Sequence, residues 1–373
     1  MRPETEAELA EMIASTSEPF SIRGGGTRGL AANGTPLETG ALTGVTLYEP
    51  GALTLVAGAG TPIAEIDALL ASEGQRLAFE PMDHRGLLET EGEPTLGGVV
   101  AGNISGPRRV QAGACRDFLL GVRYVDGMGQ IVKNGGRVMK NVTGYDLVKL
   151  MAGSYGTLGV LTELSLKVLP EPESQAVVLI EGLEIASAVE AMSAALGSPY
   201  DVTGAAHTTK GLDGSPVTMI RVEGFENSTA YRAGELQKLL AGFGDSAVET
   251  DPERTRAGWK WVRDVEAFYG QQGDVWRISC KPTDAAELAS RLDAEGLLFD
   301  WGGGLIWALM PEGTDSRAKL GAFDGHATLV RVSDYTKSNL PVFQPEPLAI
   351  AALSRGLKQR FDPKGILNPG LMG

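Results

Sequence analysis

Glycine is concentrated in two stretches of this chain, and that concentration limits what the chain can fold into. Four glycines fall within residues 22–30 (IRGGGTRGL), and fifteen fall within residues 91–160. Because glycine weakens helices and strands, such clusters need a reason: the backbone turns with positive φ, or something approaches it closely. Simple turns are one interpretation of each cluster. The presence of two clusters in one half of the chain favours a ligand that both of them contact.

The first cluster matches the dinucleotide pattern G-x-G-x-x-G through Gly24, Gly26 and Gly29. That pattern indicates a Rossmann fold only where a helix follows directly. Residues 30–40 contain Asn-Gly and a proline and show no helical periodicity, which excludes this fold. What remains is a loop of consecutive N–H groups after a strand expected at 19–23, flanked by Arg23 and Arg28. Such a nest of N–H groups binds anions and suits a diphosphate.

The length of 373 residues favours two domains over one, and the sequence patterns place a boundary between them. Strands are expected at 53–57, 118–125 and 130–133, and a helix with Thr61 as its N-cap. The composition changes at Pro170–Gln175, and strands then alternate with helices, which predicts an α+β cap with an antiparallel sheet. A last helix ends at Asp362-Pro363. The expected domains are therefore 1–170, 171–345 and a C-terminal helix and tail, 346–373, that returns to the first domain.

The charge and the cysteines exclude several function classes. With 33 Lys and Arg against 47 Asp and Glu, the net charge of −14 argues against nucleic acid and anionic membranes as partners. Cys115 and Cys280 form no C-x-x-C pair, so neither a thiolate zinc site nor an iron–sulfur cluster is expected, and no metal is assigned. Two isolated thiols favour a reducing compartment over one long-range disulfide. With no apolar run of ~18 residues and no signal peptide, we expect a cytoplasmic protein.

Four segments, in this order, resemble the FAD-binding fold of the vanillyl-alcohol oxidase type, also called PCMH-type. They are IRGGGTRGL, PTLGGVVAGNISG, KNVTGYDLVKLMAGSYGTLGVLTELSLKVLP and FDPKGILNPG. Segments of the expected cap, VWRIS, FDWGGGLIW and GHAT, are similar to the family of glycolate oxidase E subunits. The resemblance implies an α+β protein with a PCMH-type FAD-binding domain of two α/β subdomains and a cap. It further implies an FAD-dependent dehydrogenase subunit that oxidises glycolate, a 2-hydroxy acid, to glyoxylate.

The resemblance also assigns cofactor contacts residue by residue. The FAD diphosphate is assigned to the backbone of Arg23, Gly24, Gly25, Gly26 and Thr27. The flavin and ribityl side is assigned to Thr95, Gly97, Gly98, Gly102, Asn103, Ser105 and Gly106. The adenosine half is assigned to Tyr155, Gly156, Gly159 and Val160, with Asn368 reaching the flavin from the C-terminus. Covalent relatives carry a histidine where this chain has Thr27, so the FAD is expected to be non-covalent. An alternative for Gly156 and Gly159 is packing against a strand.

A dehydrogenase acting on a 2-hydroxy acid needs a cation for the carboxylate and a base for the hydroxyl proton. Arg277, between apolar residues in VWRIS, and His326, at the start of a cap strand, are the candidates. We expect both in one pocket facing the flavin. The alternatives are a structural salt bridge for Arg277 and, for each of the three histidines including His84 and His207, a surface or satisfied polar role.

Two functions remain open for the chain. Catalytic relatives of this fold often carry a closely spaced pair of cap histidines with acidic neighbours, and this sequence has no such pair. The chain is then either a subunit that oxidises glycolate or a non-catalytic FAD-bearing relay or assembly subunit of the same complex. Because its two cysteines cannot hold an iron–sulfur cluster, we expect the electrons to leave to another chain. The alternative is a free-standing flavoenzyme that uses a diffusible acceptor. The resemblance implies two partners, a second flavin subunit and an iron–sulfur subunit.

Overall fold

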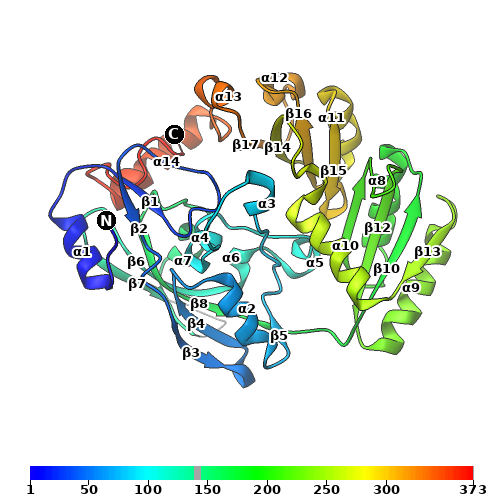
Figure 1. Ribbon diagram of the computed structural model, residues 1–373, viewed down its shortest axis with the longest axis horizontal. Coiled ribbons are helices and arrows are strands. Elements are labelled where there is room, and N and C mark those ends of the chain that lie inside the picture. Colours follow the sequence, from blue (N-terminus) through cyan, green and yellow to red (C-terminus); the bar gives the residue numbers. More distant parts are fainter. Residues whose placement is uncertain (138–143, 373) are drawn as a thin grey trace. The chain divides into compact units, whose positions relative to one another are not determined.

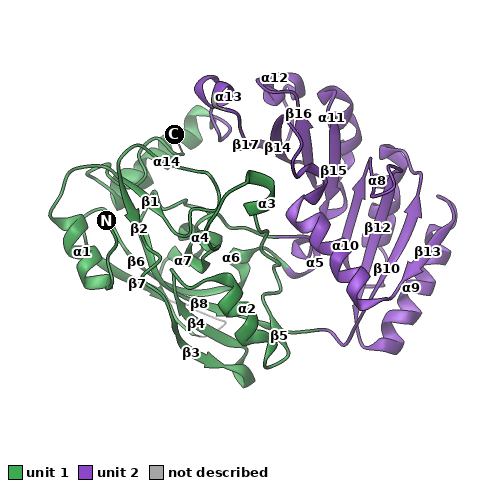
Figure 2. Ribbon diagram, viewed as in Figure 1, with its two compact units in different colours: residues 1–105, 113–171, 346–373 green, residues 106–112, 172–345 purple. Residues whose placement is uncertain are grey.

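The computed structural model describes residues 1–137 and 144–372, which form two compact units (Figure 2). Unit 1 comprises residues 1–105, 113–171 and 346–373, and unit 2 comprises residues 106–112 and 172–345. Residues 138–143, which include the first four residues of the KNVTG motif, lie outside the described residues. The expected domains differ from these units at Glu171, which lies in unit 1, and at the short segment 106–112, here called the strap. The strap lies in the sequence of the first domain but packs as part of unit 2.

Unit 1 is built around a five-stranded antiparallel sheet (Figure 1). Its strands, in spatial order, are β3 (Val45–Glu49), β4 (Thr54–Gly58), β8 (Val160–Lys167), β6 (Leu119–Val125) and β7 (Ile131–Gly135). A parallel pair joins β1 (Phe20–Arg23) to β2 (Thr35–Glu38), and a short antiparallel pair joins β5 (Gln75–Arg76) to β9 (Leu169–Pro170). The strands expected at 53–57, 118–125 and 130–133 are confirmed to within two residues at each end.

The helices of unit 1 are mostly short. They are α1 (Glu6–Ala14), α2 (Ile63–Ala71), α3 (Arg85–Leu88), α4 (Leu96–Ala101), α6 (Cys115–Phe118), α7 (Leu147–Met151) and α14 (Leu348–Phe361). The expected N-cap of α2 is wrong: Pro62 occupies that position, and the Thr61 hydroxyl instead accepts a hydrogen bond from Gly44 N at 3.0 Å. Proline is suited to this place because it has no N–H group to satisfy.

The C-terminal tail is part of the core of unit 1. The Phe20 N–H donates to the Ile366 carbonyl (2.7 Å), and the Asn368 N–H donates to the Phe20 carbonyl (3.1 Å). Ile366 and Leu367 are buried beside Leu9 and Ile13 of α1. The tail therefore lies alongside β1, and this places Asn368 at the end of the strand that leads into the first glycine loop.

Unit 2 contains an eight-stranded sheet in which every pair is antiparallel, as expected for the cap. Its spatial order is β13 (Ser246–Glu249), β10 (Ser174–Glu181), β12 (Val217–Gly224), β11 (Val202–Thr208), β15 (Gly296–Asp300), β16 (Leu305–Met310), β14 (Asp274–Ser279) and β17 (His326–Arg331). Its helices are α5 (Arg109–Ala112), α8 (Ile185–Leu196), α9 (Glu226–Leu240), α10 (Pro252–Asp264), α11 (Ala285–Leu292), α12 (Ser316–Leu320) and α13 (Asp334–Asn339).

The two faces of this sheet have different surroundings. One face forms the main core of unit 2 with α8, α9 and α11, and Trp276 and Ile278 of β14 are fully buried in it. Because side chains alternate along a strand, Arg277 points to the opposite face. There its paired residues are Trp307 on β16 and Thr328 on β17, while His326 pairs with Ser279. Arg277 and His326 are thus brought to the same face of neighbouring strands.

Candidate functional site

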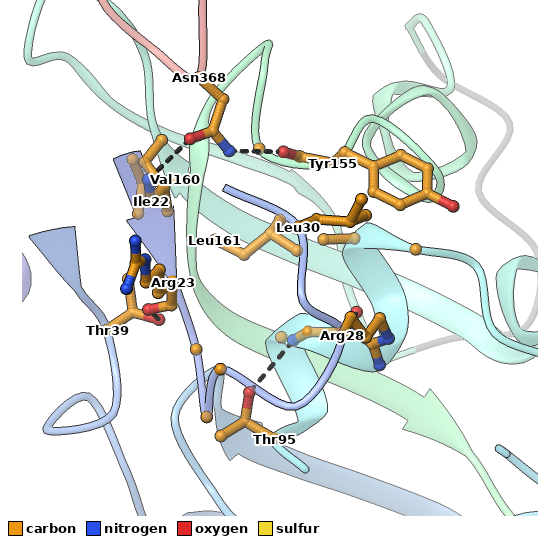
Figure 3. A pocket seen from close by; sticks show the side chains of 18 of the residues that line it. Ile22, Arg23, Arg28, Leu30, Thr39, Thr95, Tyr155, Val160, Leu161 and Asn368 are labelled. Carbon is orange, nitrogen blue, oxygen red and sulfur yellow. Dashed lines mark hydrogen bonds between the residues drawn. The ribbon is translucent and has the colours of Figure 1, made fainter. Parts of the chain in front are cut away.

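A pocket in unit 1 gathers most of the residues that the sequence assigns to FAD (Figure 3). It is lined by the first glycine loop, the start of α4, the turn at Tyr155 and the tail at Asn368. The expected residues that line it are Arg23, Gly24, Gly25, Gly26, Thr27, Thr95, Gly97, Gly98, Gly102, Tyr155, Gly156, Gly159, Val160 and Asn368. Sequence reasoning did not assign Ile22, Arg28, Leu30, Ala32, Thr39, Ala101, Leu161 or Leu371, which line it as well.

The first glycine loop offers bare N–H groups to this pocket. The N–H groups of Gly24, Gly25 and Gly26 donate no hydrogen bond within the described part of the chain. Gly26 has φ +73°, and a Cβ built on it would meet nothing within 4 Å. The backbone therefore curves with its donors unused, which is the arrangement that binds a diphosphate.

Gly25 is needed for close packing of two loops. The Cβ of any other residue at position 25 would overlap the backbone carbonyl of Glu93. Gly92 makes the reciprocal close approach to the Gly25 carbonyl. The two loops thus pack backbone against backbone, and glycine at these positions keeps the first loop in place.

The second glycine cluster contains a helix that its composition hides. Thr95 is the N-cap of α4, and its hydroxyl accepts from Gly98 N at 3.3 Å. A Cβ on Gly97 would lie 2.7 Å from the Cβ of Ala59, so glycine allows the helix to approach β4 closely. Arg28 reaches across from the first loop and donates to the Gly98 carbonyl. Burial lowers the pKa of Arg28 to about 10, which leaves it cationic at neutral pH.

Asn368 closes the pocket by joining two of its walls (Figure 3). Its side-chain oxygen accepts from Ile22 N at 2.7 Å, and its amide nitrogen donates to the Tyr155 carbonyl at 2.8 Å. Gly156 has φ +72°, and its Cβ position would lie 3.1 Å from the Asn368 amide nitrogen. For Gly159 the strand-packing alternative is supported, because a Cβ there would lie 2.6 Å from the ring of Tyr124 on β6.

Three expected flavin-side residues do not line the pocket. The Asn103 side-chain oxygen accepts from Arg116 N (3.0 Å) and the Ser105 hydroxyl accepts from Cys115 N (2.9 Å), both in the first turn of α6. Gly106 belongs to unit 2, where its carbonyl accepts from the indole of Trp301 (3.0 Å). These three hydrogen bonds fix the local conformation of residues 103–106. The sequence motif alone does not indicate that structural role.

The residues of unit 1 fit FAD. Unused N–H groups from glycine-rich turns suit the diphosphate, and Arg28 supplies a cation. The glycines that line the pocket have no side chains, which leaves room for the flat rings of FAD. Thr27 is buried in the first loop. The non-covalent attachment of FAD stays a prediction.

In unit 2, Arg277 and His326 are neighbours in an aromatic and cationic cluster. The Arg277 guanidinium lies 5.1 Å from the ring centre of Trp301 and 6.0 Å from that of Trp307. His326 is exposed at the start of β17, but partial desolvation of its ring lowers its pKa, and the charges of Arg277 and Arg109 lower it further. His326 is therefore a neutral imidazole at neutral pH, able to accept a proton.

The other two histidines have structural surroundings. His84 is buried with Nδ1 3.3 Å from the Met82 carbonyl, and His207 is buried with Nδ1 2.9 Å from the Thr218 hydroxyl. Burial lowers the pKa of His207 to about 4. Cys115 and Cys280 are both free thiols. No group of metal-ligating side chains occurs among the described residues, and none of the described helices is long and apolar enough to cross a membrane.

Comparisons with known proteins agree with this geometry. An FAD-binding domain model matches residues 1–135. Glycolate oxidase subunit GlcE of Escherichia coli is 35% identical over 98% of this chain and 95% of its own length. D-lactate dehydrogenase of Archaeoglobus fulgidus is 33% identical over 48% of this chain and 40% of its own length.

The fold is also found among solved structures. A structure of alkyldihydroxyacetonephosphate synthase covers 99% of this chain with a TM-score of 0.69 at 16% identity, and this chain spans 76% of it. That likeness confirms the α+β, PCMH-type fold. The family model and the pocket identify FAD as the cofactor. The chain is thus an FAD-dependent oxidoreductase, and it belongs to the glycolate oxidase subunit GlcE family.

Proposed function

We propose that this chain is the FAD-binding subunit of a complex that oxidises glycolate to glyoxylate and passes the electrons to a partner subunit. The observation that carries the proposal is that Arg277 and a neutral His326 lie on the same face of neighbouring strands in the unit 2 sheet. A cation and an uncharged base are the two protein groups that oxidation of a 2-hydroxy acid requires. Family membership supports the same reaction class.

Each residue has a defined role in this proposal. Arg277 holds the substrate carboxylate, for which the planar guanidinium is matched by two parallel hydrogen bonds. His326 accepts the hydroxyl proton, because its lowered pKa keeps the imidazole unprotonated at neutral pH. FAD, when bound, supplies the two-electron acceptor. Trp301 and Trp307 provide an apolar surround that strengthens the charge interactions of Arg277.

The proposal includes two protein partners. Two relatives are named as subunits of glycolate oxidase, GlcE of Escherichia coli and GlcD of Bacillus subtilis. The two cysteines of this chain cannot ligate an iron–sulfur cluster. A second flavin subunit and an iron–sulfur subunit are therefore proposed to receive the electrons.

A non-catalytic role in the same complex is the second candidate. It is favoured by the absence of a closely spaced histidine pair anywhere in the sequence, since the three histidines are His84, His207 and His326. In that case the flavin relays electrons or supports assembly, and substrate is oxidised on the partner flavin subunit.

Anaerobic addition of glycolate to the FAD-loaded chain distinguishes the two roles. If the chain oxidises glycolate, the visible flavin absorption bleaches, and Arg277→Gln and His326→Gln each slow the bleaching by a factor of roughly 10² or more. Arg256→Gln, an exposed arginine on α10, is the matched control and should leave the rate unchanged. An FAD-loaded chain that glycolate does not bleach, alone or with its partners' flavin removed, supports the relay role.

The pH dependence of bleaching gives a second test of His326. Because its pKa is lowered, the base is already unprotonated at pH 7, and the rate should fall only when the pH drops below the ordinary histidine value of 6.5. The His326→Gln variant should lose this acid limb. A wild-type rate that keeps the same value down to pH 4 contradicts the assignment.

A further inference from the structure

We propose that the exposed face of helix α14 is the surface on which this chain docks an electron-receiving partner subunit, and that the docked element is a helix with an apolar face and acidic flanks. The inference rests on the proposed function only for the identity of the partner. It adds the surface that the partner occupies and the chemistry of the segment that fits it.

An apolar stripe on α14 lies open to solvent. No residue of this fourteen-residue helix is fully buried, although helices of globular proteins normally bury one apolar stripe. Ile350, Leu353 and Leu357 follow the spacing i, i+3, i+7 and therefore share one side of the helix. All three are exposed, Leu353 by 68% and Leu357 by 41%. No described residue covers this stripe.

α14 is anchored at its C-terminal end to the rest of unit 1 (Figure 2). The Lys358 ammonium donates to the carbonyls of Thr157 (2.7 Å) and Leu367 (2.6 Å). The Phe361 ring packs against Tyr124, with 6.4 Å between the ring centres. These contacts hold the last four residues of the helix. The apolar stripe before them is not needed to attach the helix and is available to another molecule.

The shape of the exposed face suits a second helix. Ala349, Ala352 and Gly356 are exposed and form a row of small residues beside the apolar stripe. A Cβ built on Gly356 would meet nothing within 4 Å, so packing within the described chain does not require glycine there. Large side chains beside a row of small ones form the ridge and groove into which the side chains of another helix pack.

The charge of α14 defines the flanks of the segment that fits it. The chain carries a net charge of −14, but α14 contains Arg355, Lys358 and Arg360 and no Asp or Glu. Arg355 and Arg360 are exposed, and neither forms an ion pair with a described residue. Acidic residues would be favoured in the first turn by the helix dipole, yet none occurs there. An acidic segment is thus attracted to this helix, whereas the net charge of the chain repels it elsewhere.

The position of α14 explains why the partner should be one that receives electrons. Asn368, which lines the FAD pocket, follows the end of α14 by seven residues. The two carbonyls that Lys358 binds belong to Thr157 and Leu367, the sequence neighbours of the pocket residues Gly156 and Asn368. A subunit seated on α14 is therefore linked to the wall of the cofactor pocket through one side chain, and electron transfer from a flavin requires such a close approach.

Two other occupants fit this surface less well. A second copy of the chain carries the same net charge of −14 and would bring identical arginines together. A membrane surface gains from large apolar side chains, since interfacial helices carry Trp, Phe and Leu on their apolar face. The small residues Ala349, Ala352 and Gly356 would add little to insertion. Both occupants are outcomes of the test below.

Affinity capture of the full chain, co-expressed with the second flavin subunit and the iron–sulfur subunit of the proposed complex, tests the surface. Leu353→Glu should lower the amount of captured partner by roughly tenfold or more, because docking would bury an unpaired carboxylate. Arg360→Glu should also lower it, and Arg360→Lys should restore capture because it keeps the charge. Leu212→Glu is the matched control, since Leu212 is an exposed leucine of unit 2. Circular dichroism and FAD content show whether each variant is folded.

Photo-crosslinking from position 353 identifies the occupant. Leu353→Cys is labelled with a benzophenone, and the wild-type chain treated in the same way reports any labelling of Cys115 and Cys280. A cross-link to a helix with acidic flanks on either partner subunit supports the inference. A cross-link within this chain or to a second copy overturns it. Flotation of the wild-type chain with phosphatidylglycerol vesicles, lost in Leu353→Glu, overturns it as well.

The outcomes separate this inference from the proposed function. Full capture of the partners by Leu353→Glu overturns the inference and leaves the proposed function in place. Capture that depends on α14, in a chain whose flavin glycolate does not bleach, supports the inference and overturns glycolate oxidation by this subunit. A wild-type chain that captures neither partner overturns the inference together with the proposed complex, while bleaching by glycolate still reports the reaction by itself.

Discussion

Replacing Asn368 by alanine should weaken FAD binding, since this side chain joins two walls of the cofactor pocket. Asn368 is 4% exposed, and its two hydrogen bonds link Ile22 at the end of β1 to the turn at Tyr155. Each neutral hydrogen bond contributes roughly 1 kcal/mol net. Asn368 also has φ +42°, a left-handed conformation that costs alanine about 1 kcal/mol. The total is about 3 kcal/mol.

That energy sets the expected size of the effect. If the whole of this free energy is lost from the conformation of the pocket that binds FAD, the Kd for FAD rises by about a hundredfold, because 1.4 kcal/mol corresponds to a factor of ten. Fluorescence titration of the apoprotein with FAD measures it, and thermal unfolding measures the accompanying loss of stability. Asn339→Ala on α13 is the matched control, since it removes one exposed hydrogen bond to Tyr335. Unchanged FAD affinity and melting temperature in Asn368→Ala would refute the reasoning.

Three further predictions concern the glycine loop, a buried histidine and the cofactor. Gly25→Ala should lower the melting temperature strongly, since its Cβ would overlap the Glu93 carbonyl, whereas Gly40→Ala, where a Cβ meets nothing within 4 Å, should not. The free energy of unfolding should fall as the pH drops from 6.5 towards 4, because unfolded chains protonate His207 while its folded pKa is about 4; His207→Asn should flatten that slope in pH-dependent denaturation. Acid precipitation should release all the yellow colour into the supernatant, given Thr27 in the first loop, and colour retained in the pellet would indicate a covalent flavin.

The glycine clusters made the cofactor pocket predictable from sequence, but not the reason for each glycine. A run such as Gly24–Gly26 indicates that something lies close to the backbone. Only the fold shows that for Gly25 this neighbour is the Glu93 carbonyl, while Gly26 faces open space. The helix α4 was missed because its sequence, LGGVVA, consists of weak helix formers apart from Leu and Ala. The Thr95 cap and close packing on Ala59 outweigh that propensity.

Arg109, whose charge lowers the pKa of His326, could not be assigned to that cluster from the sequence, because the partners of the strap are distant along the chain. It lies among residues that the motif assigns to the flavin side, and its neighbour Arg108 pairs with Glu223, 115 residues later. The alternation around Arg277 was readable, since Trp276 and Ile278 on either side are apolar. The antiparallel sheet that brings His326 to the same face depends on pairing between β14 and β17, and local patterns do not contain that pairing.

The strap has a consequence for how the protein is made. The ribosome adds roughly 5–20 residues per second. Arg108 is therefore synthesised about ten seconds before Glu223, with which it forms an ion pair in the folded protein. Folding of unit 1 cannot be completed before residues 346–372 are synthesised, and these residues follow all of unit 2 in the sequence. Neither unit can therefore be completed from one continuous stretch of chain. A cut near residue 171 would leave the strap in the N-terminal fragment and the rest of unit 2 in the C-terminal fragment. Folding of the two units is bound to the synthesis of the whole polypeptide, and a gene for either half alone would encode an incomplete protein.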